Sequence, residues 1–527
     1  MGVRQLENAP GTPHHRTRSA VDETPRGRAL LDVLWSDWRL GVLAAVALAA
    51  GFGLLSAWLT PRGPITTSEA LISMATALAV GLGAGMVMGT RWSILVTPVV
   101  FAVVFEIARI GMVGPTVDAI NLGSFYGILA FAIGRGVHGL LVLLPLALGS
   151  VYGVRLASRL GNPTSPTMGG IGWTFTALGT LVLAAVAFFI VLPASTSPIV
   201  GADGEPLEGS VAELTTVTIG GHDQTMMIRG RSVDNPVLLY LTGGPGGTDL
   251  GAIRRDVTLE DDFTVVVWDQ RGAGKSYATL DPTDTFTLEQ FVADTIDVTN
   301  YLRDRFDEER IYLVGQSWGS TLGVMAVQQD PELFHAFVGV GQMVSQRETD
   351  IMFWDDTLAW AEETGDTDLA GVLRSNGPPP YENINLYEPV VSHEHDWNPY
   401  PGLDLGNEMP AILFVPEYTW MDRINAFRGF LDTNATLYPQ LQGVDFRQDV
   451  TALDIPFYMV VGEHEARGRA EIASEWFDIL DATSKEEFIL QDSGHRAHFD
   501  RPGDFADVMA HVLEQSSSSP STGDTTP

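Results

Sequence analysis

The sequence contains no cysteine among its 527 residues. This absence excludes disulfide bonds, thiolate metal sites, a cysteine nucleophile and an N-terminal lipid-modified cysteine. Lysine is almost absent too, because Lys275 and Lys485 are the two in the whole chain. Arginine therefore carries nearly all of the positive charge.

Charge of either sign is scarce in the first third of the chain. Residues 1–193 carry twelve arginines and eight acidic residues, whereas the remainder carries 19 basic and 57 acidic residues. A chain of this length exceeds one hydrophobic core, and the charge difference indicates parts in different surroundings. The acidity of the second part argues against partners such as nucleic acid or an anionic membrane surface.

Long apolar runs are what the first part has in place of charge. Each is long enough to cross about 30 Å of hydrocarbon as a helix, and a buried soluble helix rarely stays uncharged for so long. The sequence therefore predicts a transmembrane region at 40–193. About five helices are expected, at Leu40–Leu59, Ala70–Gly89, Trp92–Met112, Val137–Val154 and Ile171–Leu192. The shorter run Ile120–Gly134 leaves a sixth crossing open.

Arginines beside these runs predict the orientation. Six precede the first run, Arg91 lies between the second and third, and Arg155 and Arg159 follow the fourth. With five crossings all nine face the cytoplasm, which places the C-terminal part outside, whereas a sixth crossing would turn it inward. The polar residues 1–39 are expected to form a disordered cytoplasmic N-terminus.

Short β-rich runs alternating with helical patterns follow a linker predicted at 194–214. Such alternation is typical of an α/β fold with a mostly parallel sheet and helices on both faces. The alternation stops over 343–448, which predicts a helical cap inserted between two parts of one core, 215–342 and 449–515. Residues 516–527 are rich in Ser, Thr and Pro and are expected to form a disordered tail.

The stretch Gly315-Gln316-Ser317-Trp318-Gly319 has the pattern G-x-S-x-G. A strand pattern precedes it and a helical pattern follows it, which is typical of a nucleophile elbow. Glycines at 315 and 319 remove side chains that would collide with neighbouring elements in a strained turn. We therefore predict Ser317 as a nucleophile.

A serine nucleophile needs a base and an acid that orients the base. His495 lies on a loop after a predicted strand, at the edge of the sheet where Ser317 also emerges, and is the predicted base. His498 is the fallback. Glu465 lies on the loop after the preceding strand and is the predicted acid, with Glu463 as the nearest alternative.

The backbone N–H groups of Gly244 and Trp318 are the predicted oxyanion donors, the first from the glycine-rich loop 242–247. Neither that loop nor Gly272–Ser276 has the spacing of a nucleotide-binding Walker motif. His393–Asp396 has two histidines without a clear third ligand, which favours a solvated loop over a metal site. No metal or cofactor is expected.

Four blocks of this part resemble the signatures of the proline iminopeptidase (prolyl aminopeptidase) family of α/β-hydrolases. They lie in the family's order and spacing, at Leu241–Gly246, Asp269–Ser276, Gly315–Ser320 and Ser493–His495. The resemblance covers Thr215–Leu513. It implies a Ser/acid/His triad, no cofactor, and release of an N-terminal residue, often proline, from small peptides.

Carried over, the resemblance implies Ser317 as nucleophile, His495 as base and Glu465 in place of the family's aspartate. A second departure is Thr242, where the family usually has the histidine of H-G-G-P-G. Acidic cap residues of the family hold the substrate's amino group. Five glutamates are candidates and the sequence does not choose among them: Glu362, Glu363, Glu388, Glu408 and Glu417.

The sequence thus predicts a membrane-anchored serine hydrolase of aminopeptidase type that acts on small peptides outside the cytoplasmic membrane. One alternative is an esterase or amidase acting on small non-peptide substrates. An alternative of another class is a non-catalytic membrane receptor or transporter component with a degenerate hydrolase domain.

Overall fold

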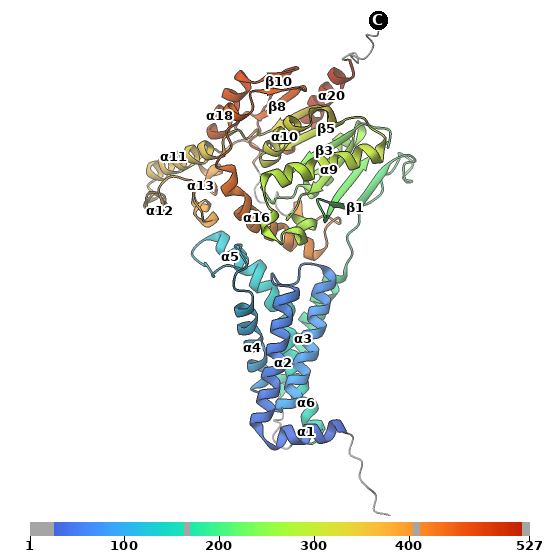
Figure 1. The fold of residues 1–527 in the computed structure, drawn as a ribbon, viewed down its shortest axis with the longest axis vertical. Coiled ribbons are helices and arrows are strands. Elements are labelled where there is room, and N and C mark those ends of the chain that lie inside the picture. The colour runs from blue at the N-terminus through green and yellow to red at the C-terminus, as the bar shows by residue number, and fades with distance from the viewer. Residues whose placement is uncertain (1–25, 163–168, 404–411, 519–527) are drawn as a thin grey trace, which may run out of the picture.

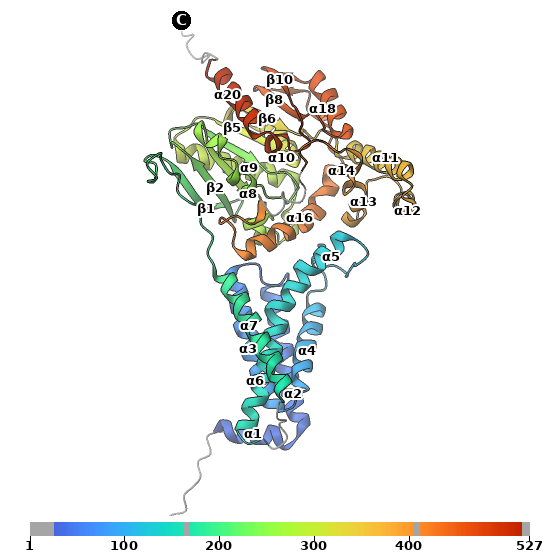
Figure 2. The ribbon, with the colours of Figure 1, turned by 180° about the vertical axis from the view of Figure 1, so that it is seen from behind.

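The computed structural model describes residues 26–162, 169–403 and 412–518. A bundle of helices and an α/β domain are stacked along the long axis of the molecule (Figure 1). Helix α1 (Arg26–Ser36) lies at the end of the bundle that is remote from the α/β domain. From behind, α7 leads out of the bundle towards β1 (Figure 2).

Four helical runs of the bundle are long and apolar enough to cross a membrane, within the described residues. Three of them have 22 residues and the fourth, Phe125–Arg159, has 35. This fourth run contains two π-helical segments (η1, Ala132–Gly136; η2, Gly139–Leu143). The α-helices of the bundle after α1 are α2 (Trp38–Leu59), α3 (Thr67–Met88), α4 (Ser93–Ala108), α5 (Phe125–Phe131), α6 (Leu144–Arg159) and α7 (Gly170–Val191).

One predicted crossing differs from the structure, and the run that was left open is resolved by it. The third expected run, Trp92–Met112, is reduced to the 16-residue helix α4, about 24 Å long. The run Ile120–Gly134, which the sequence left open as a sixth crossing, forms no separate helix. From Phe125 onward it belongs to the run Phe125–Arg159, which also contains the fourth expected crossing, Val137–Val154. That run is about 52 Å long, which exceeds the hydrocarbon thickness of a bilayer. Its α5 end projects beyond the bundle beneath the α/β domain (Figures 1 and 2).

Small residues allow α3 and α6 to pack closely. A Cβ atom at Gly81 would lie 2.2 Å from the carbonyl oxygen of Leu146, and one at Gly149 would lie 2.2 Å from that of Leu78. Gly85 and Gly153 repeat this arrangement four residues later on each helix. Spacing of small residues by four is typical of helix contacts within membranes.

The α/β domain contains an eight-stranded sheet of order β1-β2-β4-β3-β5-β6-β8-β10. The pairs β1–β2 and β2–β4 are antiparallel and all the others are parallel, which confirms the predicted fold class as a mixed sheet. The strands are β1 (Val211–Ile219), β2 (His222–Gly230), β3 (Val237–Leu241), β4 (Thr264–Asp269), β5 (Ile311–Gln316), β6 (Phe334–Val340), β8 (Phe457–Gly462) and β10 (Lys485–Leu490).

Helices cover both faces of this sheet, as the alternating pattern predicts. One hydrophobic core includes side chains of α9 (Leu288–Phe306), α10 (Trp318–Gln329) and α18 (Arg467–Ile479). The core on the other face includes α8 (Leu250–Arg255) and α20 (Pro502–Ser518). Because the central strands β3, β4 and β5 are buried along their whole length, they read as continuous apolar runs.

A helical insertion lies between β6 and β8, where the sequence predicts the cap. Its helices are α11 (Gln346–Thr364), α12 (Thr367–Asn376), η7 (Ile384–Leu386), α13 (Glu388–Val391), α14 (Glu394–Trp397), α16 (Trp420–Leu441) and α17 (Phe446–Asp449). Helix α16 lies across the top of the bundle (Figure 1). The domain boundaries themselves stay predictions.

Buried charges join α16 to the bundle. The Asp432 carboxylate accepts hydrogen bonds from the backbone N–H and hydroxyl of Thr116 (3.0 and 2.6 Å) and from the hydroxyl of Tyr277 (2.7 Å). The buried Arg62 guanidinium lies 3.5 Å from Asp432 and donates twice to Asp281. We call the contact between α16 and the bundle the seam.

Arg428 extends the seam by capping backbone groups of the bundle. Its guanidinium is fully buried and donates to the carbonyl oxygens of Pro64 (2.9 Å) and Ile133 (3.1 and 3.0 Å). Asn425, one turn earlier on α16, donates to the carbonyl oxygen of Ile65 (2.7 Å). The α/β domain is therefore docked on the bundle and not merely tethered to it.

Three expected irregular segments are partly ordered. Residues 26–39 form α1 and the start of α2, where Trp35 packs back and donates to the carbonyl oxygen of Met86 (3.0 Å). The linker predicted at 194–214 ends earlier, because β1 begins at Val211. The tail predicted at 516–527 begins as the last turn of α20. Residues 1–25 and 519–527 lie outside the described part.

Candidate active site

Ser317 stands between β5 and α10 in a strained backbone conformation, with φ 54° and ψ −119°. A Cβ atom at Gly315 would lie 2.3 Å from the carbonyl oxygen of Gly319, and one at Gly319 would lie 2.0 Å from that of Leu241. Only glycine fits at these two positions, so the pattern G-x-S-x-G has the steric cause inferred from the sequence. The turn presents Ser317 at the carboxyl end of β5.

The imidazole of His495 lies at the same edge of the sheet. A Cβ atom at Gly341 would lie 2.8 Å from His495 Nδ1, and Gly341 follows Val340, which accepts the backbone N–H of Ser317 (3.0 Å). Gln316, next to Ser317, donates from its side chain to the carbonyl oxygen of His495 (3.4 Å). Loops far apart in the chain thus place the predicted nucleophile and base at the same edge of the sheet.

Glu465 is the carboxylate that contacts this histidine. Its Oε2 lies 2.8 Å from His495 Nδ1, and its Oε1 accepts from Arg469 Nε (2.6 Å) and from the backbone N–H of Ala466 (2.9 Å). Burial acts to raise the pKa of Glu465, but Arg469 and His495 outweigh it and hold the pKa at about 2. Glu465 is therefore ionised at neutral pH and fixes His495 with Nδ1 as a donor.

Arg469 is itself held by a second carboxylate from the cap. It pairs with Glu394 on α14, and both side chains are largely buried. Glu394 belongs to the stretch His393–Asp396, which the sequence predicts as a solvated loop. His393 and Asp396 do pair with each other near the surface, at 2.7 Å. Glu394 instead connects the cap to the Glu465–His495 pair, a role for which the stretch carries no sequence signal.

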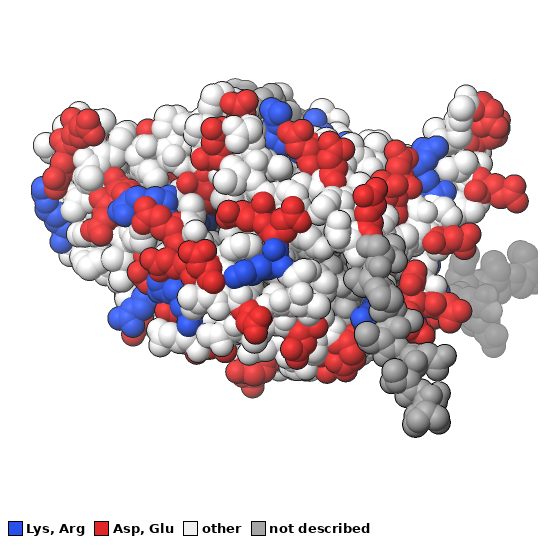
Figure 3. Space-filling view, turned by 90° about the horizontal axis from the view of Figure 1, so that it is seen from above, with Lys and Arg blue, Asp and Glu red and all other residues white. Residues whose placement is uncertain are grey.

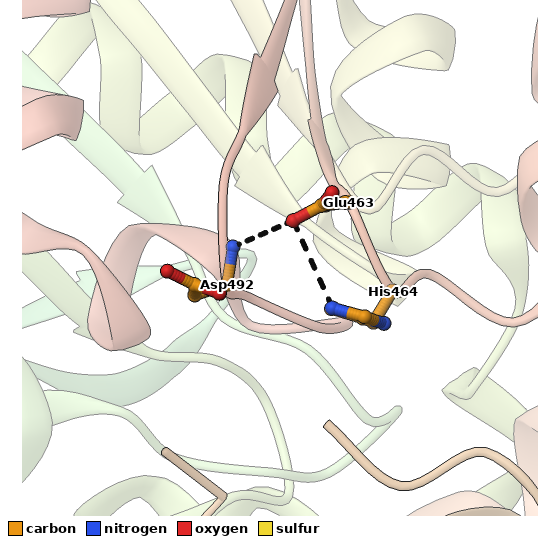
Figure 4. Close-up of side chains that lie close together, drawn as sticks. All are labelled: Glu463, His464 and Asp492. Atoms are coloured by element: carbon orange, nitrogen blue, oxygen red, sulfur yellow. Dashed lines mark hydrogen bonds and ion pairs between the residues drawn. The ribbon is translucent and has the colours of Figure 1, made fainter. Parts of the chain in front are cut away.

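Glu463 and His498, the alternatives for the acid and the base, lie away from Glu465 and His495. Glu463 is exposed, accepts the backbone N–H of Asp492 (3.0 Å) and lies 3.7 Å from His464 Nε2 (Figure 4). His498 is buried against the hydroxyl of Tyr240 (2.8 Å), and burial lowers its pKa well below the ordinary value. Neither side chain is in a position to replace Glu465 or His495.

The predicted oxyanion donors flank Ser317. Trp318 is the first residue of α10, so its N–H has no acceptor within the helix. Gly244 has φ 139° and lines the same cavity as Ser317. Gln270 connects α10 to the loop 242–247, because it accepts a hydrogen bond from Trp318 Nε1 (2.9 Å) and donates one to the carbonyl oxygen of Thr242 (3.3 Å). The sequence places Gln270 in a signature block but does not indicate these two hydrogen bonds.

A cavity of about 160 Å³ opens at Ser317 beneath the cap. Of the five candidate glutamates, Glu408 lies outside the described residues, and none of the other four lines this cavity. Glu417 is buried in an ion pair with Arg254, and Glu388 accepts the backbone N–H of Phe125. The expectation that these residues hold a substrate's amino group therefore receives no support.

Asp350 is the acidic side chain that does line the cavity. It is buried and accepts hydrogen bonds from Tyr438 (2.6 Å), Gln346 (2.9 Å) and Gln442 (2.9 Å). Burial raises its pKa to about 6, although these donors act in the opposite direction. Sequence reasoning missed Asp350, because the buried positions of α11 beside Phe353 are mostly polar and form no apolar stripe in the sequence.

A second cavity, of about 540 Å³, adjoins His495. It is more open and more polar in its lining, which includes Arg255, Tyr400 and Asp500. Ser317 therefore borders the smaller cavity, and His495 borders the larger one.

The α/β domain is similar in sequence to known proteins. Residues 236–502 match the model of a family described as "alpha/beta hydrolase fold". A Bacillus subtilis (strain 168) protein named "Probable aminopeptidase YbaC" is 29% identical over 320 residues, which cover 58% of this chain and 97% of that protein.

Proline iminopeptidases match over shorter stretches. The one from Xylella fastidiosa (strain Temecula1) is 37% identical over 103 residues, which cover 20% of this chain and 31% of the relative. Among solved structures, a proline iminopeptidase-related protein from Thermus thermophilus superposes with a TM-score of 0.42 and 22% identity, covering 58% of this chain and 98% of that one.

Proposed function

Because the chain belongs to the alpha/beta hydrolase fold family, we propose that it is a membrane-anchored serine hydrolase that releases N-terminal residues from small peptides. The observation that carries this proposal is the buried carboxylate of Asp350 in the cavity of Ser317. A peptide's protonated amino terminus is a cation that such a carboxylate binds. The likeness to an aminopeptidase-named relative supports the same substrate class.

In the proposed reaction, His495 accepts the proton of Ser317 as its hydroxyl oxygen attacks the carbonyl carbon of the first peptide bond. The N–H groups of Gly244 and Trp318 stabilise the resulting oxyanion. His495 then gives the proton to the leaving amine, so the C–N bond breaks and an acyl-enzyme remains. A water molecule, deprotonated by His495, releases the N-terminal residue and restores Ser317.

The sizes of the two cavities favour removal of one residue at a time. The cavity of about 160 Å³ at Ser317 is smaller than the roughly 300–1,000 Å³ of pockets for drug-sized ligands. It suits a single residue whose amine faces Asp350. The cavity of about 540 Å³ beside His495 gives room for the rest of the peptide, which is the leaving group.

The pKa of Asp350 gives this proposal a pH signature. Its carboxyl loses its charge as the pH falls through about 6, and attraction for an ammonium group is lost with it. We therefore expect KM for aminoacyl substrates to rise below about pH 6, while KM for an uncharged ester stays level over the same range.

The experiment compares L-proline β-naphthylamide with p-nitrophenyl acetate on the purified full-length chain. We expect Ser317→Ala to abolish turnover of both substrates. Asp350→Asn should raise KM for the naphthylamide about 30-fold or more, the loss expected when one partner of a buried charge pair is removed, and leave KM for the acetate unchanged. Turnover of the acetate alone by the wild type would favour the esterase alternative. Unchanged turnover after Ser317→Ala would contradict both enzymatic functions.

We further propose that the hydrolase domain faces away from the cytoplasm. The bundle's helices alternate so that α1 and the α/β domain lie at opposite ends (Figures 1 and 2), and the arginine placement favours α1 as the cytoplasmic end. A membrane-impermeant fluorophosphonate should label Ser317 on intact cells as strongly as in lysates. Labelling that appears only after lysis would reverse this orientation.

A further inference from the structure

The cavity at Ser317 is lined by a residue of the membrane region. Tyr126, on α5, borders the cavity together with cap residues, although it lies 191 positions before Ser317 in the chain. Helix α5 is the end of the 35-residue run that projects beyond the bundle, and both views place it beneath the cap (Figures 1 and 2). A hydrolase domain by itself would have an opening at this point.

Aromatic packing positions the Tyr126 ring at the cavity. Its centroid lies 6.1 Å from that of Phe430 on α16, in an edge-to-face arrangement. Tyr126, Leu129 and Phe430 all pack against a small apolar core formed by Ala130, Ile133 and Leu431. Phe430 and Leu431 also line the cavity, so the wall near the bundle is one apolar cluster made by α5 and α16.

The same part of the membrane region also contacts the cap segment 384–391. The backbone N–H of Phe125 donates to Glu388 (2.9 Å), and the Ser124 hydroxyl lies 3.4 Å from the side-chain oxygen of Asn385. Three residues of this segment line the cavity: Ile384, Tyr387 and Val391. The start of α5 thus contacts the cavity both directly and through the cap segment.

We propose that Tyr126 is a specificity-determining residue, and that the membrane region completes the pocket for the substrate's N-terminal residue. This inference rests on the proposed function and deepens it, since it names the substrate class as peptides with a small or compact apolar first residue. Asp350 holds the amine, and the Tyr126–Phe430 wall limits the size of the side chain. It also gives the bundle a role that a single anchoring helix would not supply.

The test measures kcat/KM of the full-length chain for β-naphthylamides of proline, alanine, leucine and phenylalanine. Tyr126→Ala enlarges the pocket, so we expect the phenylalanine-to-proline ratio of kcat/KM to rise at least tenfold. Tyr126→Trp reduces the space, so the ratio should fall below that of the wild type. Phe125→Ala is the matched control, because its side chain is 62% exposed and does not line the cavity.

The final extent of Ser317 labelling by a small fluorophosphonate serves as the measure of folding, and should be complete in all three variants. Ratios that stay at the wild-type value in both Tyr126 variants would overturn the inference. If the wild type hydrolyses no aminoacyl naphthylamide, the proposed function fails instead. The role of Tyr126 is then tested on p-nitrophenyl esters of increasing acyl length, where Tyr126→Ala should shift the preference to longer chains and an unchanged preference would overturn it.

Discussion

The two regions of this chain place their apolar side chains in opposite ways. In the bundle, glycines such as Gly81 and Gly149 occupy the helix contacts, while Leu43, Ile72 and Phe175 are each more than 60% exposed. In the α/β domain the large apolar side chains are inside, as with the fully buried Trp268 and Trp476. Hydrocarbon around the bundle would remove the reason to bury leucine and leave close packing as the main attraction between helices.

The outer surfaces differ in the same sense. Seen from the end remote from the bundle, the α/β domain shows many acidic groups and fewer basic ones (Figure 3). Such a surface suits water and not an anionic membrane. The two regions meet at a third environment, the seam. There the side chains of Asp432 and Arg62 are buried inside the protein. The comparison therefore predicts that substitutions in the domain, in the seam and in the bundle have separable effects.

The largest effect is expected inside the domain, from Glu465→Gln. The amide keeps the shape but no longer balances an imidazolium or fixes its Nδ1–H, so kcat should fall about 1,000- to 10,000-fold. Bundle and seam should keep their structure, which a wild-type circular dichroism spectrum at neutral pH in detergent would show. Activity within tenfold of the wild type would mean that another group orients His495.

The same variant tests the pKa of Glu465. Its value of about 2 in the folded chain lies below its ordinary 4.5, so the ionised carboxylate contributes stability above about pH 4.5 and loses that contribution as the pH falls towards 2. We expect the difference in Tm between wild type and Glu465→Gln to be constant from pH 5 to 7 and to shrink below pH 4.5. A constant difference down to pH 2 would contradict the low pKa.

The next effect is expected at the seam, from Asp432→Asn. Removing one partner of a buried charge cluster leaves Arg62 partly uncompensated, which costs about 3 kcal/mol or more. Thermal unfolding in detergent should then separate into two transitions, one for the bundle and one for the α/β domain. The control is Asp281→Asn, because Asp281 is the more exposed partner of Arg62 and should cost about 1 kcal/mol or less. Equal losses of unfolding free energy in Asp432→Asn and Asp281→Asn would show that burial of Asp432 does not increase its contribution to stability.

The smallest effect is expected within the bundle, from Gly149→Ala. The added methyl group would meet the carbonyl oxygen of Leu78 at 2.2 Å, so α3 and α6 must move apart at a cost of about 1–3 kcal/mol. Gly51→Ala on α2 is the control, because nothing lies within 4 Å of the added atom. Guanidinium or heat unfolding in detergent measures both. Loss of Ser317 labelling by fluorophosphonate in Gly149→Ala would contradict separable effects in the two regions. Helix packing in the bundle would then affect the reactivity of Ser317 in the α/β domain.

Much of this arrangement was predictable because its causes are local. The pattern around Ser317 requires glycine at 315 and 319, and the structure gives the clashes that any side chain there would make. The strands were predictable because fully buried parallel strands are continuous apolar runs. The contact between Glu465 and His495 was predictable from their positions after successive strands, which meet at one edge of a sheet.

The misses have equally physical causes. The run Ile120–Gly134 left a sixth crossing open, because hydropathy does not distinguish a helix that continues past a bilayer from one that ends. Asp350 and Glu394 were missed because their partners, Tyr438 and Arg469, are 88 and 75 positions away. Residues 26–39 were expected to be disordered from their polarity, but Trp35 orders them by packing against α3.

The sequence by itself determined the two kinds of region, the α/β class of the second and the residues that could do chemistry there, since these follow from composition, periodicity and short motifs. Only the tertiary structure decided that the cavity at Ser317 is lined by Asp350 and by Tyr126 of α5. Such contacts depend on where elements distant in the chain meet. The 35-residue run fixes that meeting point, because one continuous helical run carries α5 from the bundle to the cap.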